Sequence, residues 1–348
     1  MDVGILINVR RHPDEQRSLS SVYQNHIEDV QYAEQLGFTH AWSSEHHFAW
    51  DQWTPAQFPL LATVAARTSR IRIGTHLVVA PYHHPLRLAE DAAVLDILSG
   101  GRLELTVGAG SIGEEFRTFN IDKGERFGRL FETVDILRKC FTEEEFDHEG
   151  KYFTFPSVRM TTRPLQDQLP LWVGASGPTS VKRVARRGLN IAGATAFGTI
   201  GLFDSELRAL GRDPRDHGSM TLVMIHIADT EDQAWEEASR GIHHWLNFYN
   251  SLDWVALEFL GAKLKLPEPD QMRYWKESPI PFHVGTVEQV TESLMAELCA
   301  VRHTGVALSF RQPFMETTAV RHSMDLFAAH IMPQLQAWQH PVEEVVAS

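Results

Sequence analysis

The stretch from Thr39 to Phe48 reads THAWSSEHHF. Its first four residues form a short apolar run, and a polar cluster from Ser43 to His47 follows at once. A strand of a β/α barrel has this form when it leaves the core and delivers side chains to a site at its C-terminal end. Histidine titrates near neutral pH, so His46 beside the carboxylate of Glu45 suits proton transfer or metal binding. A strand-end loop with solvated histidines is the alternative interpretation.

Strands and helices alternate along the rest of the chain, which implies parallel strands joined by helical crossovers. The predicted strands are Val3–Asn8, Thr39–Trp42, Ile71–Val79, Arg102–Gly108, Leu171–Gly174, Asn190–Ala192, Thr221–Ala228 and Val306–Phe310. The predicted helices are Ser18–Leu36, Pro55–Thr68, Leu86–Leu98, Glu125–Cys140, Thr179–Arg187, Leu202–Leu210, Glu231–Phe248 and Glu316 to about Ile331. Tyr152–Phe155 is typical of a small hairpin.

This alternation predicts an α/β fold, a (β/α)8 TIM barrel formed as a single domain over residues 1–348. A doubly wound open sheet is the alternative, but no G-x-G-x-x-G motif follows the first strand. Residues 251–285 interrupt the alternation of strands and helices before the last strand, because aromatic residues, prolines and charged residues mix there without a clear period. An insertion at this place predicts a lid over the active site, and packing on the outside or at a dimer interface is the alternative.

Composition limits the classes of partner. The chain has 348 residues and a net charge of −13, which argues against nucleic acid or an anionic membrane as the main partner. No apolar run approaches the roughly 20 residues that a membrane helix needs, and the N-terminus shows no secretion signal. Cys140 and Cys299 lie far apart in helical patterns, so they fit neither a disulfide framework nor a metal knuckle. We expect a cytoplasmic protein.

Small and polar residues also follow the third, fourth and fifth predicted strands, in the segments Pro81–His84, Gly108–Ser111 and Ala175–Thr179. All of these segments would lie at the C-terminal face of a barrel. In the last segment, small residues let backbone amides approach a ligand closely, and a helix begins there. Free N–H groups at a helix N-terminus suit a phosphate group. Simple capping of the helix is the alternative.

Four longer runs occur in order along the chain: EHHF at Glu45–Phe48, IRIGTHLVVAPYHHPLRLAEDAAVLDILSGGRLELTVGAG at Ile71–Gly110, EEF-x-x-F-x-I-D at Glu114–Asp122, and VGASGPTSVKRVARRG at Val173–Gly188. With these runs the sequence resembles the bacterial luciferase-like flavin monooxygenase family. The resemblance spans most of residues 1–192 and returns near Val306. It implies a (β/α)8 barrel, which agrees with the alternation of strands and helices.

The resemblance also implies roles for individual residues. FMN would lie across the barrel mouth with its phosphate at the helix start near Ser176 and Thr179. His46 would be the catalytic acid or base with Glu45 beside it, and His47 would be structural. The residues expected to bind the cofactor are His76, Leu77, Ala109, Gly110, Arg126, Val173, Ala175, Ser176, Gly177 and Thr179.

Two positions depart from the family pattern. The family often has a non-prolyl cis peptide bond behind the flavin, and the matching bond here is His76–Leu77, although a small residue is expected where His76 stands. Some relatives place an arginine after the fourth strand that reaches the phosphate, whereas this chain has Ala109. Arg126, at the start of the next helix, is expected to supply that charge. The alanine also leaves open weaker flavin binding or a different cofactor tail.

The activity implied by the resemblance is a two-component monooxygenation. A separate flavin reductase supplies reduced FMN, O2 adds to it as a flavin hydroperoxide, and a small hydrophobic organic substrate is oxygenated in a site closed to water. Trp50, Trp53, Phe58, Phe197 and Trp254 would suit such a substrate, and core packing is their alternative role. The resemblance further implies a homodimer formed through the helices near residues 53–67 and 86–98.

Three other functions remain open. A deazaflavin-dependent hydride-transfer enzyme could use the same scaffold without oxygen. A metal-dependent barrel hydrolase could draw its ligands from His46, His47, His76, His83 and His84, although H-x-H on the first strand and a bridging lysine are missing. A non-catalytic relative would bind FMN without turnover. The leading interpretation expects no metal.

Overall fold

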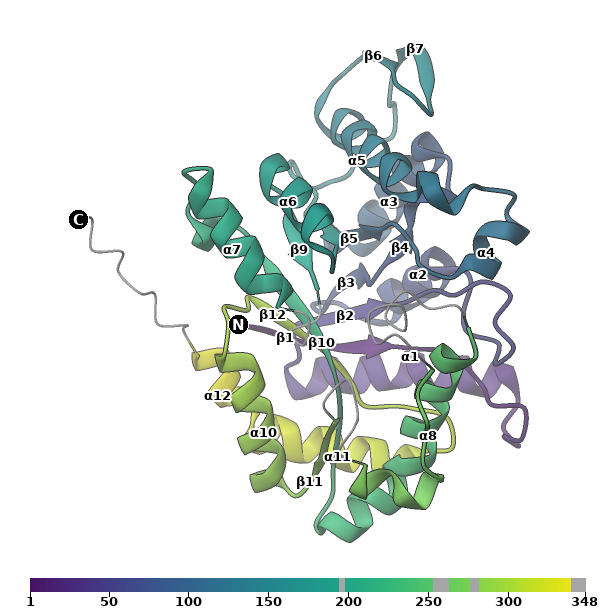
Figure 1. Ribbon diagram of the computed structural model, residues 1–348, viewed down its shortest axis with the longest axis vertical. Coiled ribbons are helices and arrows are strands. Elements are labelled where there is room, and N and C mark those ends of the chain that lie inside the picture. The colour runs from purple at the N-terminus through teal and green to yellow at the C-terminus, as the bar shows by residue number, and fades with distance from the viewer. Residues whose placement is uncertain (194–197, 253–262, 276–281, 339–348) are drawn as a thin grey trace, which may run out of the picture.

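Parallel strands close into a barrel in the computed structural model (Figure 1), which describes residues 1–193, 198–252, 263–275 and 282–338. Strand β10 hydrogen-bonds with both β9 and β12, which closes the ring in the order β12-β1-β2-β3-β5-β8-β9-β10. The predicted (β/α)8 barrel is therefore confirmed. Its strands are β1 (Asp2–Ile7), β2 (His40–Ser43), β3 (Arg72–Thr75), β5 (Leu103–Gly108), β8 (Leu171–Gly174), β9 (Asn190–Ala192), β10 (Ser219–Ile227) and β12 (Gly305–Ser309).

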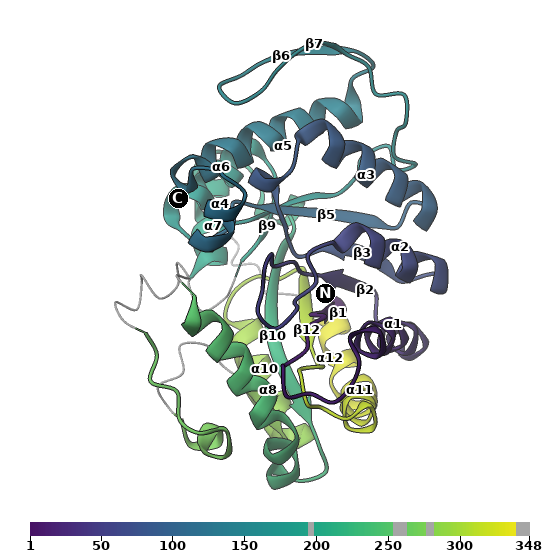
Figure 2. The same ribbon diagram turned by 90° about the vertical axis from the view of Figure 1, so that its right-hand side faces the viewer.

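Helices surround these strands in both views (Figures 1 and 2). The first of them shows how local sequence sets the boundaries, because the Ser18 hydroxyl accepts the N–H of Ser21 and Gly37 ends the helix in the left-handed conformation with φ 93°. The described helices are α1 (Leu19–Leu36), α2 (Gln57–Arg67), α3 (Pro85–Ser99), α4 (Gly113–Thr118), α5 (Arg126–Thr142), α6 (Pro178–Arg187), α7 (Thr199–Ala209), α8 (Glu231–Ser251), α10 (Val287–Cys299), α11 (Thr317–His330) and α12 (Met332–Ala337). The predicted hairpin is β6 (Phe146–Glu149) with β7 (Thr154–Val158).

The middle of the barrel is filled by Trp42, which is only 2% exposed and packs with Leu6 and Ala192. The two strands beside β2 carry glycine at this level. A Cβ atom on Gly4 or Gly74 would lie 2.5 or 2.6 Å from the indole ring, which is closer than carbon atoms can approach. These glycines therefore leave the space in which the indole closes the barrel below its C-terminal mouth.

The prediction that Ile71–Val79 forms a single strand is wrong. The structure divides it into β3 and a short β4 (Val78–Val79), and each part pairs with β5. Between the two parts the His76–Leu77 peptide bond is cis, as the family resemblance implied. The interruption takes His76 and Leu77 out of the ladder and places them at the barrel mouth.

The irregular region 251–285 contains an element that the sequence pattern did not reveal. Phe282–Gly285 forms β11, which lies parallel to the last residues of β10 and leads into α10. Residues 253–262 and 276–281, like the tail 341–348, lie outside the described residues. The role of this region as a lid therefore stays a prediction.

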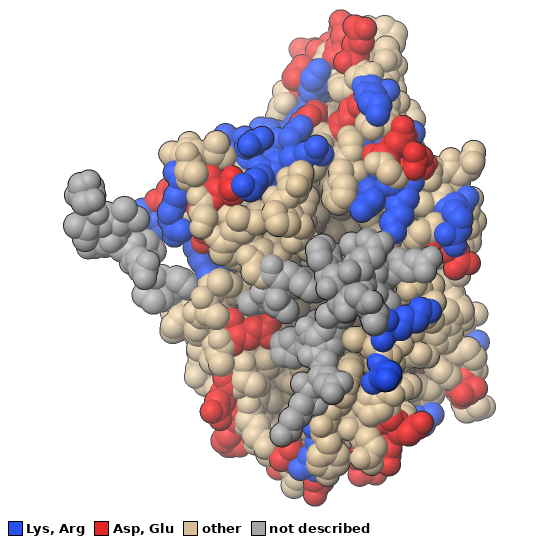
Figure 3. Space-filling model, in the orientation of Figure 1, with Lys and Arg blue, Asp and Glu red and all other residues tan. Residues whose placement is uncertain are grey.

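Basic side chains gather on one face of this acidic chain, over the region of α6 (Figure 3). Several have acidic partners nearby, because Lys182 Nζ lies 3.0 Å from Glu206 Oε1 and Arg187 Nε lies 3.2 Å from Asp135 Oδ1. Such pairs offset part of the local positive charge.

None of the helices that the structure describes combines the length and apolar character that crossing a bilayer requires.

Candidate active site

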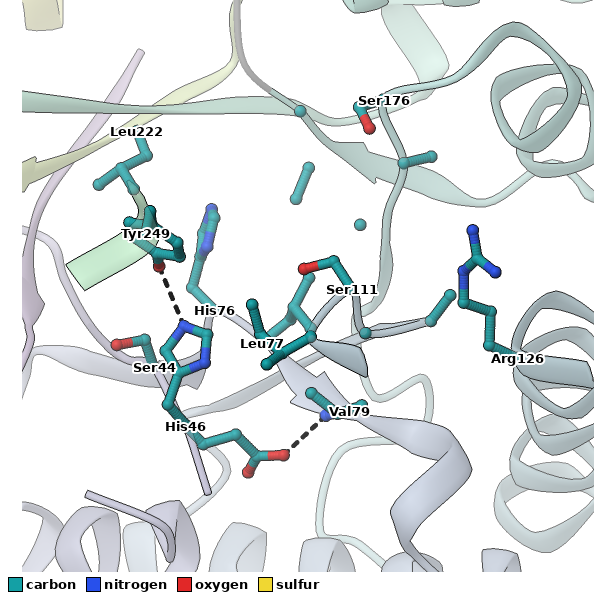
Figure 4. A pocket seen from close by; sticks show the side chains of 18 of the residues that line it. Ser44, His46, His76, Leu77, Val79, Ser111, Arg126, Ser176, Leu222 and Tyr249 are labelled. Carbon is teal, nitrogen blue, oxygen red and sulfur yellow. Dashed lines mark hydrogen bonds between the residues drawn. The ribbon is translucent and has the colours of Figure 1, made fainter. Parts of the chain in front are cut away.

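A cavity of about 510 Å³ opens at the C-terminal ends of the barrel strands (Figure 4). This volume lies within the range of small-molecule sites. Nine of the residues predicted from the sequence line it: Glu45, His46, His76, Leu77, Ala109, Gly110, Arg126, Ala175 and Ser176. The barrel thus brings together side chains from segments that are far apart in the sequence.

Three predicted cofactor-binding residues do not line the cavity: Val173, Gly177 and Thr179. Side chains of a strand alternate between its two faces, so Gly174 faces the cavity while Val173 packs in the core between strands and helices. Gly177 is the residue before α6, and the Thr179 side chain is exposed in its first turn. Ser180 of the same turn, to which the sequence pattern gave no role, does line the cavity.

His46 is held at both ring nitrogens. Its Nδ1 lies 3.0 Å from Oε1 of Glu115, and its Nε2 lies 3.0 Å from the hydroxyl of Tyr249 on α8. A carboxylate only accepts hydrogen bonds, so Nδ1 carries the proton and Nε2 accepts the tyrosine O–H in the neutral imidazole. Burial raises the pKa of Tyr249 above its ordinary value, which keeps the hydroxyl protonated.

Glu115 is the residue that fixes this arrangement, and it was not among the residues predicted from the sequence. Besides His46, its carboxylate accepts the backbone N–H of His47 at 2.9 Å and the Tyr82 hydroxyl at 3.1 Å. The EEF run at residues 114–116 could have drawn attention to Glu115. However, no feature of the nearby sequence shows that α4 turns this carboxylate toward the loop after β2.

Glu45 points away from this group and holds a different segment. Its Oε1 accepts the backbone N–H of Val79 at 2.7 Å, and its Oε2 accepts the amide of Gln57 at 2.8 Å. Burial alone would raise the pKa of Glu45, but the nearby His47 and His83 rings and the hydrogen bond from Gln57 outweigh it and lower the pKa to about 2. The carboxylate therefore stays ionised and ties the loop after β2 to β4, which is a positioning role.

The two residues of the cis bond form part of the cavity wall. Burial lowers the pKa of His76, so its imidazole is neutral, and its Nε2 has no hydrogen-bond partner among the described residues. The Leu77 side chain packs against Gly108 and Gly174, which face each other on neighbouring strands. A Cβ atom on Gly174 would lie 2.2 Å from Cδ2 of Leu77, so this glycine provides the space for the leucine.

We expect the substitution Gly174→Ala to push Leu77 into the cavity and, if FMN binds there as the family resemblance implies, to weaken its binding about tenfold or more, because overpacking costs about 1–3 kcal/mol. The measurement is a fluorescence titration of FMN. The double substitution Gly174→Ala with Leu77→Ala should restore most of the affinity, since it removes the clashing side chain. Unchanged binding by the single variant would show that the ligand does not use this wall.

One end of the cavity is suited to an anion. Arg126 is the single Lys or Arg that lines the described part of the cavity. Its Nη1 donates to the carbonyl of Lys123 at 3.0 Å, and its guanidinium lies 4.6 Å from the ring centre of Phe127. Ser176, Pro178 and Ser180 bring the N-terminus of α6 to the cavity, and the N–H groups of a first helical turn have no partners within the helix.

The other end is apolar and aromatic. Tyr249 and Leu222 lie across the cavity from Arg126 in Figure 4. Leu6, Trp53 and Trp245 line the cavity as well. Of the aromatic residues expected at the mouth, Trp53 lines the cavity, Trp50 is 40% exposed and Phe58 packs on the core, while Phe197 and Trp254 lie outside the described residues.

The histidines near the mouth do not assemble into a metal centre. Within the described residues, no three His, Cys, Asp or Glu side chains are arranged to hold a metal ion. His47 and His83 instead approach Glu45 Oε1, at 3.6 and 3.7 Å from their Nε2 atoms. These contacts are consistent with the structural role expected for His47.

Comparison with known proteins gives consistent matches. The family profile described as luciferase-like monooxygenase matches residues 1–306. The oxygenase component of a flavin-dependent trigonelline monooxygenase from Acinetobacter baylyi is 27% identical over 261 residues, or 72% of this chain and 71% of that protein. An F420-dependent hydroxymycolic acid dehydrogenase from Mycobacterium tuberculosis is 30% identical over 279 residues, which cover 77% of this chain and 76% of that protein.

A solved structure with the same fold is that of the monooxygenase RslO1 from Streptomyces bottropensis. It superposes with a TM-score of 0.81 at 25% sequence identity, and the match covers 96% of this chain and 100% of that one. The strand order and the closed barrel described above therefore have a counterpart in a monooxygenase of known structure.

Proposed function

Because this chain belongs to the luciferase-like monooxygenase family, we propose that it uses reduced FMN and O2 to oxygenate a small, hydrophobic organic substrate. The observation that carries the proposal is the cavity with two unlike ends. The end with Arg126 and the start of α6 suits a phosphate, and the end with Trp53 and Tyr249 suits an apolar compound. FMN has a phosphate at one end and a reactive ring system at the other, so it fits this polarity.

Each part of the site has a task in this proposal. Arg126, Ser176 and the N–H groups of α6 would hold the phosphate, while His76 and Leu77 would lie against the ring system. Bound reduced FMN would supply the electrons that activate O2. His46, fixed by Glu115, would accept or donate the proton that the oxygenation requires. The buried surroundings of His46 limit the access of water to that proton.

Hydride transfer with a deazaflavin is the second candidate. It is favoured by the similarity to the F420-dependent dehydrogenase, which spans 77% of this chain. Ala109 also leaves room near the phosphate end for a cofactor tail of another kind. The scaffold and the position of His46 would be the same, but the reaction would not consume oxygen.

The experiment that separates the two candidates is a titration with each reduced cofactor under anaerobic conditions, followed by oxygen. We expect reduced FMN to bind, and oxygen uptake in the presence of hydrophobic test substrates to yield an oxygenated product.

We expect Arg126→Met to weaken FMN binding about tenfold or more and riboflavin binding about twofold or less, since only FMN carries the phosphate.

Arg117→Met is the matched control, because Arg117 is exposed on α4 and does not line the cavity. Tight binding of the reduced deazaflavin alone, without oxygen-dependent product, would replace the monooxygenase proposal with hydride transfer. Equal loss of FMN and riboflavin affinity in Arg126→Met would remove Arg126 from the phosphate site.

Two partners follow from the proposal. A separate flavin reductase would supply the reduced FMN, since the sequence contains no dinucleotide motif after its first strand.

We also propose a homodimer through the α2 and α3 face, because Val94, Ile97 and Leu98 of α3 are 46%, 40% and 61% exposed. Sedimentation velocity would contradict the dimer if the protein sediments as a monomer at micromolar concentration.

A further inference from the structure

The apolar end of the cavity contains a complete path for a proton. Tyr249 lines the cavity, and its hydroxyl lies 3.0 Å from Nε2 of His46, whose Nδ1 lies 3.0 Å from Glu115 (Figure 4). In the neutral imidazole, Nε2 is the atom that can still take up a proton. A proton arriving at the tyrosine oxygen can therefore be passed on, and the Glu115 carboxylate stabilises the imidazolium that forms.

One of the charges around Tyr249 stabilises the tyrosine oxygen as its proton leaves. The Arg10 guanidinium lowers the pKa of Tyr249, whereas the Glu115 and Asp51 carboxylates raise it. The Arg10 guanidinium is buried and lies 4.5 Å from the ring centre of Trp53. Its positive charge opposes the effect of burial and stabilises negative charge that develops near the tyrosine oxygen.

The wall beside this path restricts the compound that could use it. Trp53 and Trp245 offer aromatic rings, and Leu6 and Leu222 are aliphatic. No lysine or arginine lines this end within the described part of the chain, so a carboxylate or phosphate would lack a partner. The Arg10 charge beside Trp53 is offset by Asp51, whose Oδ2 lies 4.0 Å from Nη1 of Arg10. An uncharged aromatic compound fits best.

We propose that this end of the cavity binds a phenol and that Tyr249 is the catalytic residue that removes its proton. The inference rests on the same site as the proposed function. The phenol O–H bond breaks and its proton joins Oη of Tyr249, while the proton of Tyr249 moves to Nε2 of His46. The products are a phenolate and an imidazolium paired with Glu115. A phenol, like the tyrosine side chain, has an ordinary pKa of about 10, whereas an aliphatic alcohol is a much weaker acid and would hold its proton.

The test uses 4-nitrophenol, because its phenolate absorbs visible light and its neutral form does not. The purified protein is titrated at a pH below the pKa of the free compound, with and without oxidised FMN. We expect bound 4-nitrophenol to show the phenolate band. Its methyl ether, 4-nitroanisole, should bind about tenfold more weakly because it has no proton to transfer.

Two variants report on the proton path separately from binding. Tyr249→Phe should abolish the phenolate band, whereas Tyr32→Phe should not, because the Tyr32 hydroxyl bonds Asp325 far from the cavity. Glu115→Gln, which keeps the size of the side chain but removes its charge, should leave 4-nitrophenol bound mainly in its neutral form. Circular dichroism of each variant confirms that the fold is retained.

Equal affinity for 4-nitrophenol and 4-nitroanisole would overturn the proposal, and so would a phenolate band that persists in Tyr249→Phe. The outcome is separable from that of the proposed function. Ionisation of 4-nitrophenol by a protein that binds neither FMN nor a deazaflavin would reject the cofactor and leave the phenol site. FMN-dependent oxygenation without any ionisation of bound phenols would reject the phenol site alone.

Discussion

The His46→Ala variant is expected to lose about 10²- to 10⁴-fold in turnover while its affinity for FMN changes about threefold or less. The loss follows from geometry, since His46 is the only group that links the Tyr249 hydroxyl to the Glu115 carboxylate among the described contacts. The affinity is spared because His46 lies across the cavity from Arg126 (Figure 4). Product formation per reduced FMN consumed measures the first quantity, and fluorescence titration measures the second.

Two further variants make the His46 result specific. His46→Gln can keep one hydrogen bond to a neighbour but does not take up a proton near neutral pH, so it should lose as much turnover as His46→Ala with a smaller loss of stability. His322→Ala removes an exposed histidine that pairs with Asp229 on the outside of the barrel, and it should have no effect on turnover. Full activity of His46→Ala would remove His46 from the mechanism.

The Glu45→Gln variant is expected to lower the free energy of unfolding by about 3 kcal/mol at neutral pH. In the folded protein the pKa of Glu45 is lowered from 4.5 to about 2, because hydrogen bonds to the buried carboxylate outweigh the cost of its burial. A lowered pKa means that the folded state binds the proton more weakly than the unfolded state. The stabilisation is therefore present above about pH 4.5 and is lost as the pH falls toward about 2.

The measurement is urea denaturation of the wild type and of Glu45→Gln from pH 7 to pH 3. The difference between the two proteins should be largest at pH 7 and should shrink at acidic pH, where the wild type loses the contribution. Glu236→Gln, an exposed residue of α8, is the control and should show no such difference. A gap that stays constant over this pH range would mean that the charge of Glu45 does not carry the stabilisation.

Glu45 and His46 show how adjacent residues receive separate tasks. The Glu45 carboxylate reaches the backbone of Val79 and thereby fixes β4 beyond the cis bond. The next side chain, His46, turns to Glu115 and Tyr249 inside the cavity. Both were expected to be catalytic from the sequence. We propose proton transfer for His46 and positioning for Glu45, and the two predictions above test these roles independently.

The sequence by itself determined those features of the fold and of the site that depend on residues close together in the chain. The period of apolar residues, the glycine after α1 and the alternation of strands with helices predicted the barrel and the place of its site. Polar clusters after strands were enough to select His46 and Ser176, because all C-terminal strand ends of a parallel barrel meet at one face, whereas His76 was selected by the family resemblance.

The tertiary structure decided which of these residues act together. Glu115 is 69 residues beyond His46, and Tyr249 is 203 residues beyond it, so no local period could pair them. The inward direction of Gly174 and the outward direction of Val173 depend on the register of β8 against β5. The break in the third strand depends on the space that Gly108 and Gly174 leave for Leu77. Contacts of this kind arise only when the barrel closes, because closure alone brings distant segments within hydrogen-bond and packing distance.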